Sequence, residues 1–106
     1  MLVYTSGPYS GDIDMNIATA RWVAIKLWEA GYAVICPHLN SAHFEKDCKA
    51  TYEQYIAGDL EMVKGCDAMV MIPGWEASKG AVEERNYALS LGIPVYVWPN
   101  FPVKLC

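Results

Sequence analysis

The fold is decided by residues 68–98, AMVMIPGWEASKGAVEERNYALSLGIPVYVW, which pass from strand to helix and back to strand. Residues 68–72 are solidly apolar, as in a strand that is buried on both faces of a sheet. A Pro-Gly turn leads into a helical segment over 78–91, and residues 94–98 are typical of another strand. Because parallel strands need a crossover between them, this order predicts a parallel pair joined by a helix.

The same alternation continues toward the N-terminus. The further predicted strands are 2–5 and 33–36, and the further predicted helices are 16–30 and 51–65. The candidates for the cap of the first helix are Asp12, Asp14 and Asn16. The polar segment 38–50 is predicted to be a long loop that closes over a site. We therefore predict one α/β domain over residues 1–106, a small doubly wound parallel sheet of the flavodoxin or Rossmann type, with about four to five strands and helices on both faces.

The composition limits the partners of the chain. It has 106 residues, 54% of them hydrophobic, and a formal net charge of -4 with eight Lys and Arg residues. The basic residues are scattered and form no stripe that would neutralise a nucleic-acid backbone, so we expect no polymer partner, whereas a single nucleotide stays open. No apolar run approaches the ~20 residues that span a bilayer, so we expect no membrane segment.

The cysteines indicate a reducing setting. They are Cys36, Cys48, Cys66 and Cys106, they show no CxxC spacing, and we expect no signal peptide ahead of the first strand. This pattern is typical of a cytoplasmic protein. His38 and His43 lie near two of the cysteines, which suggests zinc, but the spacings match no familiar zinc site. We therefore expect ordinary core thiols, with no metal and no cofactor.

Two loops are the expected walls of a ligand site. Ligands of doubly wound sheets bind beyond the carboxyl ends of the strands, where the strand order reverses. This places segments 6–11 and 74–78, after the first and third predicted strands, at the site. The first loop has two interpretations, because its backbone N–H groups suit a phosphate and its composition also suits an ordinary tight turn. It is neither a Walker A loop nor a GxGxxG fingerprint.

Two carboxylates, Asp59 and Glu84, are predicted to face inward. Neighbours three and four positions away on a helix share a face with the central residue. Around Asp59 these neighbours are Tyr55, Ile56, Met62 and Val63, and around Glu84 they are Gly80, Ala81, Tyr87 and Ala88. A half-desolvated carboxylate is costly unless it is paired or hydrogen-bonded. Catalysis explains such a residue, and so does a structural role in which either acid caps backbone or pairs with Arg21 or Arg85.

The aromatic residues suggest a surface for a second subunit. Trp22 and Trp28 fall roughly 120° apart on the first helix, at ~100° per residue, so they do not both pack on the sheet. One of them is expected to contact another subunit of a homodimer or larger homo-oligomer, and a partly exposed Trp on a monomer is the alternative. Trp75 has two equal interpretations, a platform that stacks on a base and a plug in the core.

Four groups of residues are similar to the motifs of one known family. They are Tyr4-Thr5-Ser6-Gly7-Pro8 with Gly11; Gly31-Tyr32-Ala33-Val34 with Pro37-His38; Asp59-Leu60 ahead of Asp67; and Pro73-Gly74-Trp75-Glu76 with Ser78, Gly80 and Glu84. On these motifs the chain resembles, over nearly its whole length, the nucleoside 2-deoxyribosyltransferase-like family, which includes the 2′-deoxynucleoside 5′-phosphate N-hydrolases. It is particularly similar to a branch of short members with the SGP loop and the PGWE turn.

The resemblance implies a role for each matching residue. Glu84, six residues after Ser78, matches the nucleophile. Asp59 matches the acid that protonates the leaving base, and Tyr4 matches the residue that holds the nucleophile. These roles suit the chemistry, because a glycosidic carbon reacts through an oxocarbenium-like state that a carboxylate captures while an acid protonates the departing group. The further residues expected to bind substrate or phosphate are Ser6, Gly7, Tyr9, Gly11, His38, Trp75, Ser78, Gly80 and Asn100.

Details of the resemblance bear on the substrate. Nucleotide hydrolases of the family carry Ser, and nucleoside transferases carry Asp, at the position of Ser78, which favours a 5′-phosphate. Pro8 and Tyr9 stand where those hydrolases place a basic residue, so backbone N–H groups and Ser78 would have to bind the phosphate. Asn100 is the candidate that completes the site of a neighbouring subunit.

We expect an enzyme that cleaves the N-glycosidic bond of a (deoxy)nucleoside or its 5′-monophosphate, by hydrolysis or by deoxyribosyl transfer to another base. The first alternative is a non-catalytic nucleotide-binding or sensor module with the same fold. The second is an oligomerisation domain, which only the aromatic surface supports.

Overall fold

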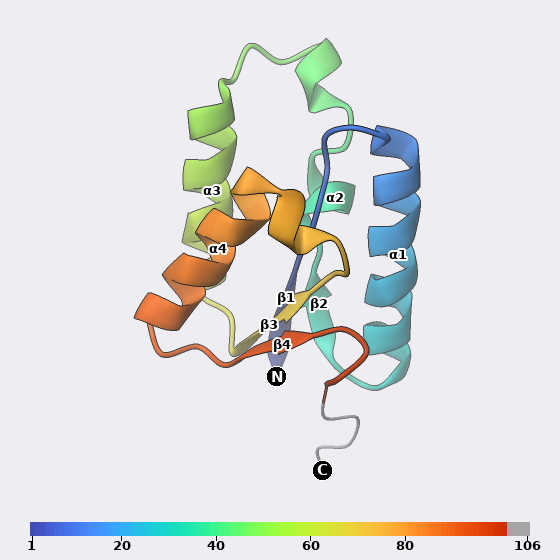
Figure 1. Cartoon of the computed structure of the whole chain (residues 1–106), viewed down its shortest axis with the longest axis vertical. Coiled ribbons are helices and arrows are strands. Elements are labelled where there is room, and N and C mark those ends of the chain that lie inside the picture. The colour runs from blue at the N-terminus through green and yellow to red at the C-terminus, as the bar shows by residue number, and fades with distance from the viewer. Residues whose placement is uncertain (102–106) are drawn as a thin grey trace.

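A four-stranded, all-parallel sheet forms the centre of the computed structural model, which describes residues 1–101 (Figure 1). The strands are β1 (Leu2–Ser6), β2 (Ala33–Ile35), β3 (Ala68–Met71) and β4 (Val95–Val97), in the order β2-β1-β3-β4. The chain runs from β1 outward to β2 and then returns to the other side of β1, so the order reverses between β1 and β3. A doubly wound sheet leaves its crevice at such a reversal, beyond the carboxyl ends of the two strands. The predicted fold class is confirmed.

Helices cover both faces of the sheet. Helix α1 (Ile13–Glu29) lies on one face, and α3 (Tyr52–Lys64) and α4 (Lys79–Ser90) lie on the other (Figure 1). The segment 38–50, predicted to be a loop, instead contains most of a short helix, α2 (Pro37–Asn40), and a 3₁₀ turn, η1 (Phe44–Lys46). Elements this short show no apolar period, and Pro37 suits the first turn of α2 because its missing N–H would have had no helical partner.

The ends of the helices follow from their caps. The Asp12 side chain accepts a hydrogen bond from the Met15 N–H at 3.2 Å, so α1 begins at Ile13 rather than at the predicted Asn16. Asp12 is therefore the cap among the three candidates. Helix α3 begins with a capping box, in which the Thr51 hydroxyl accepts from the Gln54 N–H and the Gln54 side chain accepts from the Thr51 N–H.

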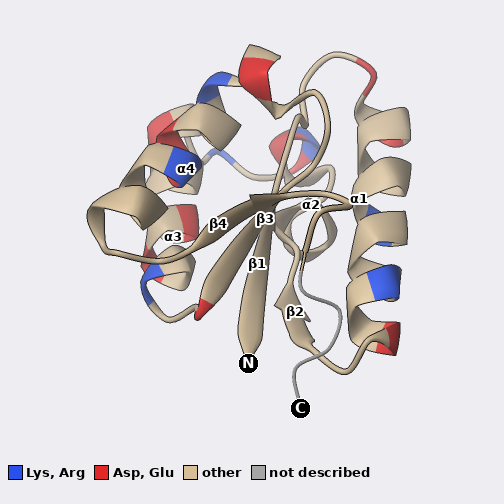
Figure 2. Cartoon of the chain, turned by 60° about the horizontal axis from the view of Figure 1, so that its bottom comes forward, with Lys and Arg blue, Asp and Glu red and all other residues tan. Residues whose placement is uncertain are grey.

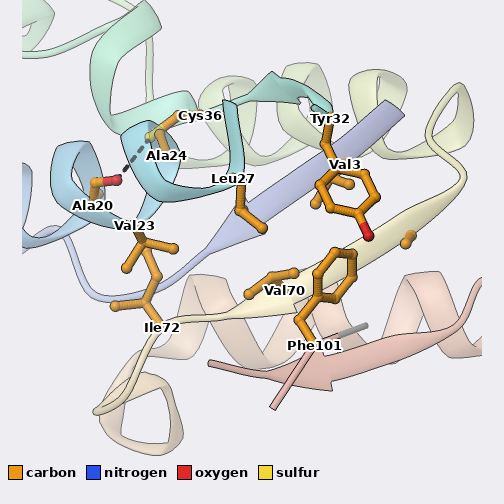
Figure 3. Close-up of a cluster of buried hydrophobic side chains, with 11 residues drawn as sticks. Val3, Ala20, Val23, Ala24, Leu27, Tyr32, Cys36, Val70, Ile72 and Phe101 are labelled. Carbon is orange, nitrogen blue, oxygen red and sulfur yellow. Dashed lines mark hydrogen bonds between the residues drawn. The ribbon is translucent and has the colours of Figure 1, made fainter. Parts of the chain in front are cut away.

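Two apolar clusters fill the spaces between the sheet and its helices. On the α1 face, Val3 and Val70 meet Leu27 (Figure 3). On the α3 and α4 face, Met69 and Met71 pack with side chains from both helices. Successive side chains of a strand point to opposite faces, so Val3 and its neighbour Tyr4 belong to different clusters. The same alternation directs the site residues of β1 toward α4.

The surface bears on the partners expected from the sequence. The described Lys and Arg residues are spread over α1, segment 44–50, α3 and α4 (Figure 2). Within residues 1–101, no helix is both long enough and apolar enough to cross a bilayer. Trp22 and Trp28 are 52% and 57% exposed, and Trp22 meets Trp98 edge to face at 5.8 Å. Neither Trp is buried under α1, and the homo-oligomer stays a prediction.

Candidate active site

A cavity of about 830 Å³ opens beyond the carboxyl ends of β1 and β3, where the strand order places a ligand crevice. Its walls come from the loop after β1, the start of α1, α2, η1, α3 and the start of α4. The predicted site residues that line it are Gly7, Tyr9, His38, Asp59, Ser78, Gly80 and Glu84. Residues from both predicted loops therefore meet at one site.

Glu84 lies in the wall of this cavity with both carboxylate oxygens hydrogen-bonded. The side chain is only 6% exposed. Its Oε2 accepts a hydrogen bond from the Tyr4 hydroxyl at 3.0 Å, and its Oε1 accepts one from the Ser6 hydroxyl at 2.6 Å. Tyr4 and Ser6 are two residues apart on β1, so they share the face of the sheet that α4 covers. Both lie behind Glu84 and outside the cavity lining, which differs from the expectation that Ser6 contacts substrate.

Asp59 of α3 and Glu84 of α4 both line the cavity. The two carboxyl groups are close enough for each to shift the pKa of the other. Burial raises the pKa of Glu84, Asp59 raises it further, and the Ser6 and Tyr4 hydroxyls oppose that rise. Burial also raises the pKa of Asp59, and the carboxyl group of Glu84 opposes that rise. Two carboxyl groups in such contact do not both ionise readily, so the pair shares one proton near neutral pH.

Neither acid uses the arginine partners that a structural role would offer. The guanidinium of Arg85 lies over the ring of Trp75, 5.1 Å from its centroid. Trp75 packs against the apolar cluster between the sheet and α4 and does not line the cavity. Of its two interpretations, the core plug fits this position better than the base platform.

Tyr9 ties the first loop to η1. Its hydroxyl lies 2.9 and 3.1 Å from the two Glu45 carboxylate oxygens, and it accepts a hydrogen bond from the His43 N–H at 2.8 Å. The imidazole of His43 lies 3.3 Å from the Asp14 carboxylate at the start of α1. Asn16 holds the loop from the other side, because its side-chain amide donates to the carbonyls of residues 9 and 10. These contacts hold segment 43–45 against the first loop and the start of α1, at one side of the cavity.

His38 contributes a neutral ring to the cavity wall. It is 5% exposed, and burial lowers its pKa, a shift that the hydrogen bond to Pro8 opposes. Its Nε2 lies 2.7 Å from the Pro8 carbonyl oxygen, which can only accept, so Nε2 carries the proton. Its Nδ1 is a buried acceptor without a hydrogen-bond partner within residues 1–101.

Three small residues of the site have structural reasons to be small. A Cβ on Gly80 would lie 3.2 Å from the Ile56 side chain and 3.3 Å from the Tyr52 hydroxyl, so Gly80 lets α3 approach α4. A Cβ on Gly7 would lie 2.7 Å from Cβ of Ile72. The Ser78 hydroxyl caps α4 by accepting a hydrogen bond from the Ala81 N–H at 3.2 Å. Binding roles for these residues stay predictions.

Some expected site residues lie elsewhere. Gly11 forms the exposed turn before α1 with φ of +96°, and Asn100 follows β4, bridged to Val97. Neither lines the cavity of this chain, and a role for Asn100 in a neighbouring subunit stays a prediction.

Other cavity residues were not found by sequence reasoning. They are Asn16, Glu45, Tyr52, Tyr55, Ile56 and Lys79, among others. Tyr52, Tyr55 and Ile56 precede Asp59 by seven, four and three residues, which is the spacing of one helix face. That stripe was the available signal for them. No pattern in the sequence indicated that Glu45 and Lys79 line the cavity, because their positions depend on η1 and on the start of α4.

The thiols and histidines do not gather. Cys36 and Cys66 are buried, whereas Cys48 is exposed, which corrects the expectation of core thiols at that position. Cys106 lies outside the described residues. Among residues 1–101, no group of three His, Cys, Asp or Glu side chains is arranged to hold a metal ion.

A family model described as a domain of unknown function, DUF4406, matches residues 1–97. The chain belongs to the DUF4406 family. No curated protein matches this DUF4406 sequence. Its fold, in contrast, is found in solved structures.

Three solved structures share the fold of this DUF4406 chain. A 2-deoxyribosyltransferase from Bacillus psychrosaccharolyticus aligns with a TM-score of 0.72 and 21% identity over 92% of this chain and 71% of its own. A conserved protein from Enterococcus faecalis V583 has a TM-score of 0.78 and 20% identity, over 92% and 62%. A 2-deoxyribosyltransferase from Leishmania mexicana has a TM-score of 0.65 and 21% identity, over 91% and 62%. The DUF4406 chain thus spans between 62% and 71% of these proteins.

Proposed function

We propose that the chain cleaves the N-glycosidic bond of a nucleoside or nucleoside 5′-monophosphate, with Glu84 as the nucleophile. The observation that carries the proposal is the pair of carboxyl groups in the wall of the cavity, buried Glu84 and half-buried Asp59. The likeness of its fold to two 2-deoxyribosyltransferases supports the same chemistry. The SGP loop and the PGWE turn are proposed as the marks of a short branch within that group.

For the reaction the shared proton has to move to Asp59, because in the free site burial and the neighbouring Asp59 raise the pKa of Glu84 to about 8 and so leave the proton on Glu84 near neutral pH. Both oxygens of Glu84 accept hydroxyl hydrogen bonds, from Tyr4 and Ser6, and such donors stabilise a charged carboxylate. Burial raises the pKa of Asp59 as well, which suits a proton donor. The pair therefore offers one nucleophile and one acid side by side.

The reaction takes two steps. In the first, a Glu84 oxygen bonds to the anomeric carbon, the C–N bond breaks with its electron pair going to the base, and Asp59 gives that base its proton. In the second, water or another base attacks the same carbon, Asp59 takes up the proton that the attacking group loses, and the ester to Glu84 breaks. Attack by water completes hydrolysis, and attack by a base completes deoxyribosyl transfer.

The charge of the cavity favours the nucleoside over its monophosphate. The carboxyl groups that line it belong to Asp12, Glu45, Asp59 and Glu84. Among residues 1–101, Lys79 is the one Lys or Arg residue in the lining. The ammonium group of Lys79 lies over the Tyr52 ring, 5.3 Å from its centroid. A phosphate dianion would be repelled by this surplus of negative charge. Ser78 is the residue that favours a phosphate, and its hydroxyl already caps α4.

The test is release of free base. Purified protein is incubated with a panel of deoxy- and ribonucleosides and their 5′-monophosphates, with and without a second base, and the products are separated by chromatography. The proposal requires that wild type releases or exchanges base and that Glu84→Gln does not. If neither protein acts on any substrate while a nucleotide still raises the melting temperature, the chain is a sensor module instead.

A further inference from the structure

The contact between Ser6 and Glu84 has the geometry of a strong hydrogen bond to a charged group. Ser6 is the last residue of β1 and is 1% exposed. Its hydroxyl lies 2.6 Å from Oε1 of Glu84, and the Tyr4 hydroxyl lies 3.0 Å from Oε2. Hydroxyl donors to ionised carboxylates lie at about 2.5 to 2.7 Å. Only the Ser6 contact falls within that range.

We propose that Ser6 is a positioning residue for Glu84 and contributes more than Tyr4 to stabilising the ionised form of that carboxyl group and to orienting it. The inference rests on the proposed function in that Glu84 is the nucleophile there. It departs from the sequence-based expectation in two ways. Ser6 acts through Glu84 rather than on the substrate, and the main support of Glu84 is the serine rather than the tyrosine.

The surroundings of Glu84 make such a donor necessary. The titratable groups that face it are Tyr4 from β1 and Asp59 and Tyr52 from α3. Each of these is negative when ionised, so none of them favours the charge on Glu84. Lys79 and His38 line the same cavity, but Lys79 lies over the Tyr52 ring and His38 is held neutral by burial. Hydrogen bonds therefore have to offset the burial of Glu84, and Ser6 is the foremost donor.

Ser6 also fixes the plane of the carboxylate. Each carboxylate oxygen has two lone-pair directions. Because Ser6 occupies one direction on Oε1 and Tyr4 one on Oε2, the group is held at both ends and cannot rotate without breaking a bond. The remaining lone pairs are those available to Asp59 and to an anomeric carbon. Loss of the Ser6 hydroxyl should therefore affect both the ionisation of the Glu84 carboxyl group and its orientation.

The experiment reads the carboxyl group directly. Protein labelled with ¹³C at the glutamate carboxyl carbons is titrated by NMR, and the Glu84 signal is assigned by its loss in Glu84→Gln. We expect Ser6→Ala to move the Glu84 midpoint upward by about one to two pH units, the shift that a hydrogen bond to a charged group is worth. Tyr4→Phe should move it less. Ser6→Thr, which keeps the hydroxyl, should leave it near the wild-type midpoint.

Thr5→Val is the matched control. Thr5 is the neighbouring residue on β1, it is fully buried, and its hydroxyl points to the opposite side of the sheet, 3.5 Å from the Ile35 carbonyl. Removing that hydroxyl should leave the Glu84 midpoint unchanged. If Ser6→Ala does not fold, Ser6→Cys replaces it, because a thiol is a weaker donor and should give a smaller upward shift.

The outcomes separate this inference from the proposed function. An unchanged midpoint in the Ser6 variants, or a larger shift in Tyr4→Phe than in Ser6→Ala, overturns the role of Ser6 even if wild type releases base. An upward shift in a protein that releases no base supports the role of Ser6 and leaves the proposed function to fail alone. If base is released, the apparent pKa of the acid limb of the kcat–pH profile should be higher in Ser6→Ala than in wild type, by the same amount as the NMR midpoint.

Discussion

The carboxyl groups of Asp59 and Glu84 line one cavity and shift each other's pKa, although one is carried by α3 and the other by α4. Two acids placed so close in a buried wall lower the stability of the fold whenever both are charged. Groups with perturbed pKa values cluster at functional sites. The cost itself is measurable without any substrate.

Replacing Glu84 by Gln should stabilise the protein in a pH-dependent way. Burial raises the pKa of Glu84 from 4.5 to about 8. An acid whose pKa is higher in the folded than in the unfolded protein stabilises the fold while it is protonated. This contribution is fully present below the pKa of the unfolded state and is lost as pH rises through the pKa of the folded state. Wild type should therefore lose stability between about pH 5 and 8 that Glu84→Gln retains. Since ~1 kcal/mol moves the melting temperature of a small domain by about 4 to 8 °C, we expect a gain of several degrees at pH 8.

Thermal unfolding at pH 5 and pH 8 checks this, with Glu61→Gln as the control. Glu61 is exposed and pairs with Lys64 at 2.9 Å, so its replacement should change little at either pH. A gain in Glu84→Gln that is equal at the two pH values would contradict the explanation by buried charge.

Replacing Asp59 by Asn should harm the reaction most where the leaving base needs a proton. General acid catalysis contributes about 10²- to 10⁴-fold. We expect base release from an ordinary nucleoside to fall by that order. In a nucleoside with a cationic base, such as a 7-methylated purine, the base leaves without protonation. The rate of base release from such a substrate should therefore fall much less. Chromatographic rates for the two substrate types measure the difference, and an equal loss for both would show that Asp59 is not the acid.

The sequence predicted those features that depend on local pattern. The buried strand 68–71 and helix α4 followed from apolar runs and from glycines, and the inward direction of Glu84 followed from its helical neighbours. The partner of Glu84 at Ser6 did not follow, because the two residues are far apart in sequence and meet only through the register of β1 against α4. Tyr4 was found because it carries a family motif, whereas no pattern assigns Ser6 to Glu84.

Glu45 should help the site to discriminate against phosphate. Its carboxylate is held at the cavity by the Tyr9 hydroxyl. We expect wild type to prefer a nucleoside to its 5′-monophosphate in kcat/KM. Glu45→Gln should raise the value for the monophosphate several-fold more than that for the nucleoside, and added salt should narrow the difference, since salt screens exposed charges. Glu29→Gln, at the far end of α1, is the control. A wild type that prefers the monophosphate would contradict this reading of the cavity charge.

Gly7 should be intolerant of a side chain for a steric reason that lies beside the site. A Cβ at this position would lie 2.7 Å from Cβ of Ile72, and also 3.1 Å from its Cδ1. The nearer atom is attached to the backbone and cannot move away by a change of rotamer. Gly7→Ala should therefore push the loop after β1 outward and destabilise the protein by about 1 to 3 kcal/mol.

Two further variants show whether the contact with Ile72 is the cause. Ile72→Val removes only Cδ1, so in the Gly7→Ala background it should restore little stability, because the Cβ contact persists. Gly58→Ala is the matched control, since a Cβ there would meet nothing within 4 Å and the residue lies inside α3. It should stabilise the protein by about 0.5 to 1 kcal/mol through helix propensity. Urea unfolding of wild type and these three variants measures these differences. Recovery of full stability in Gly7→Ala with Ile72→Val would place the conflict at the end of the Ile72 side chain instead of at its base.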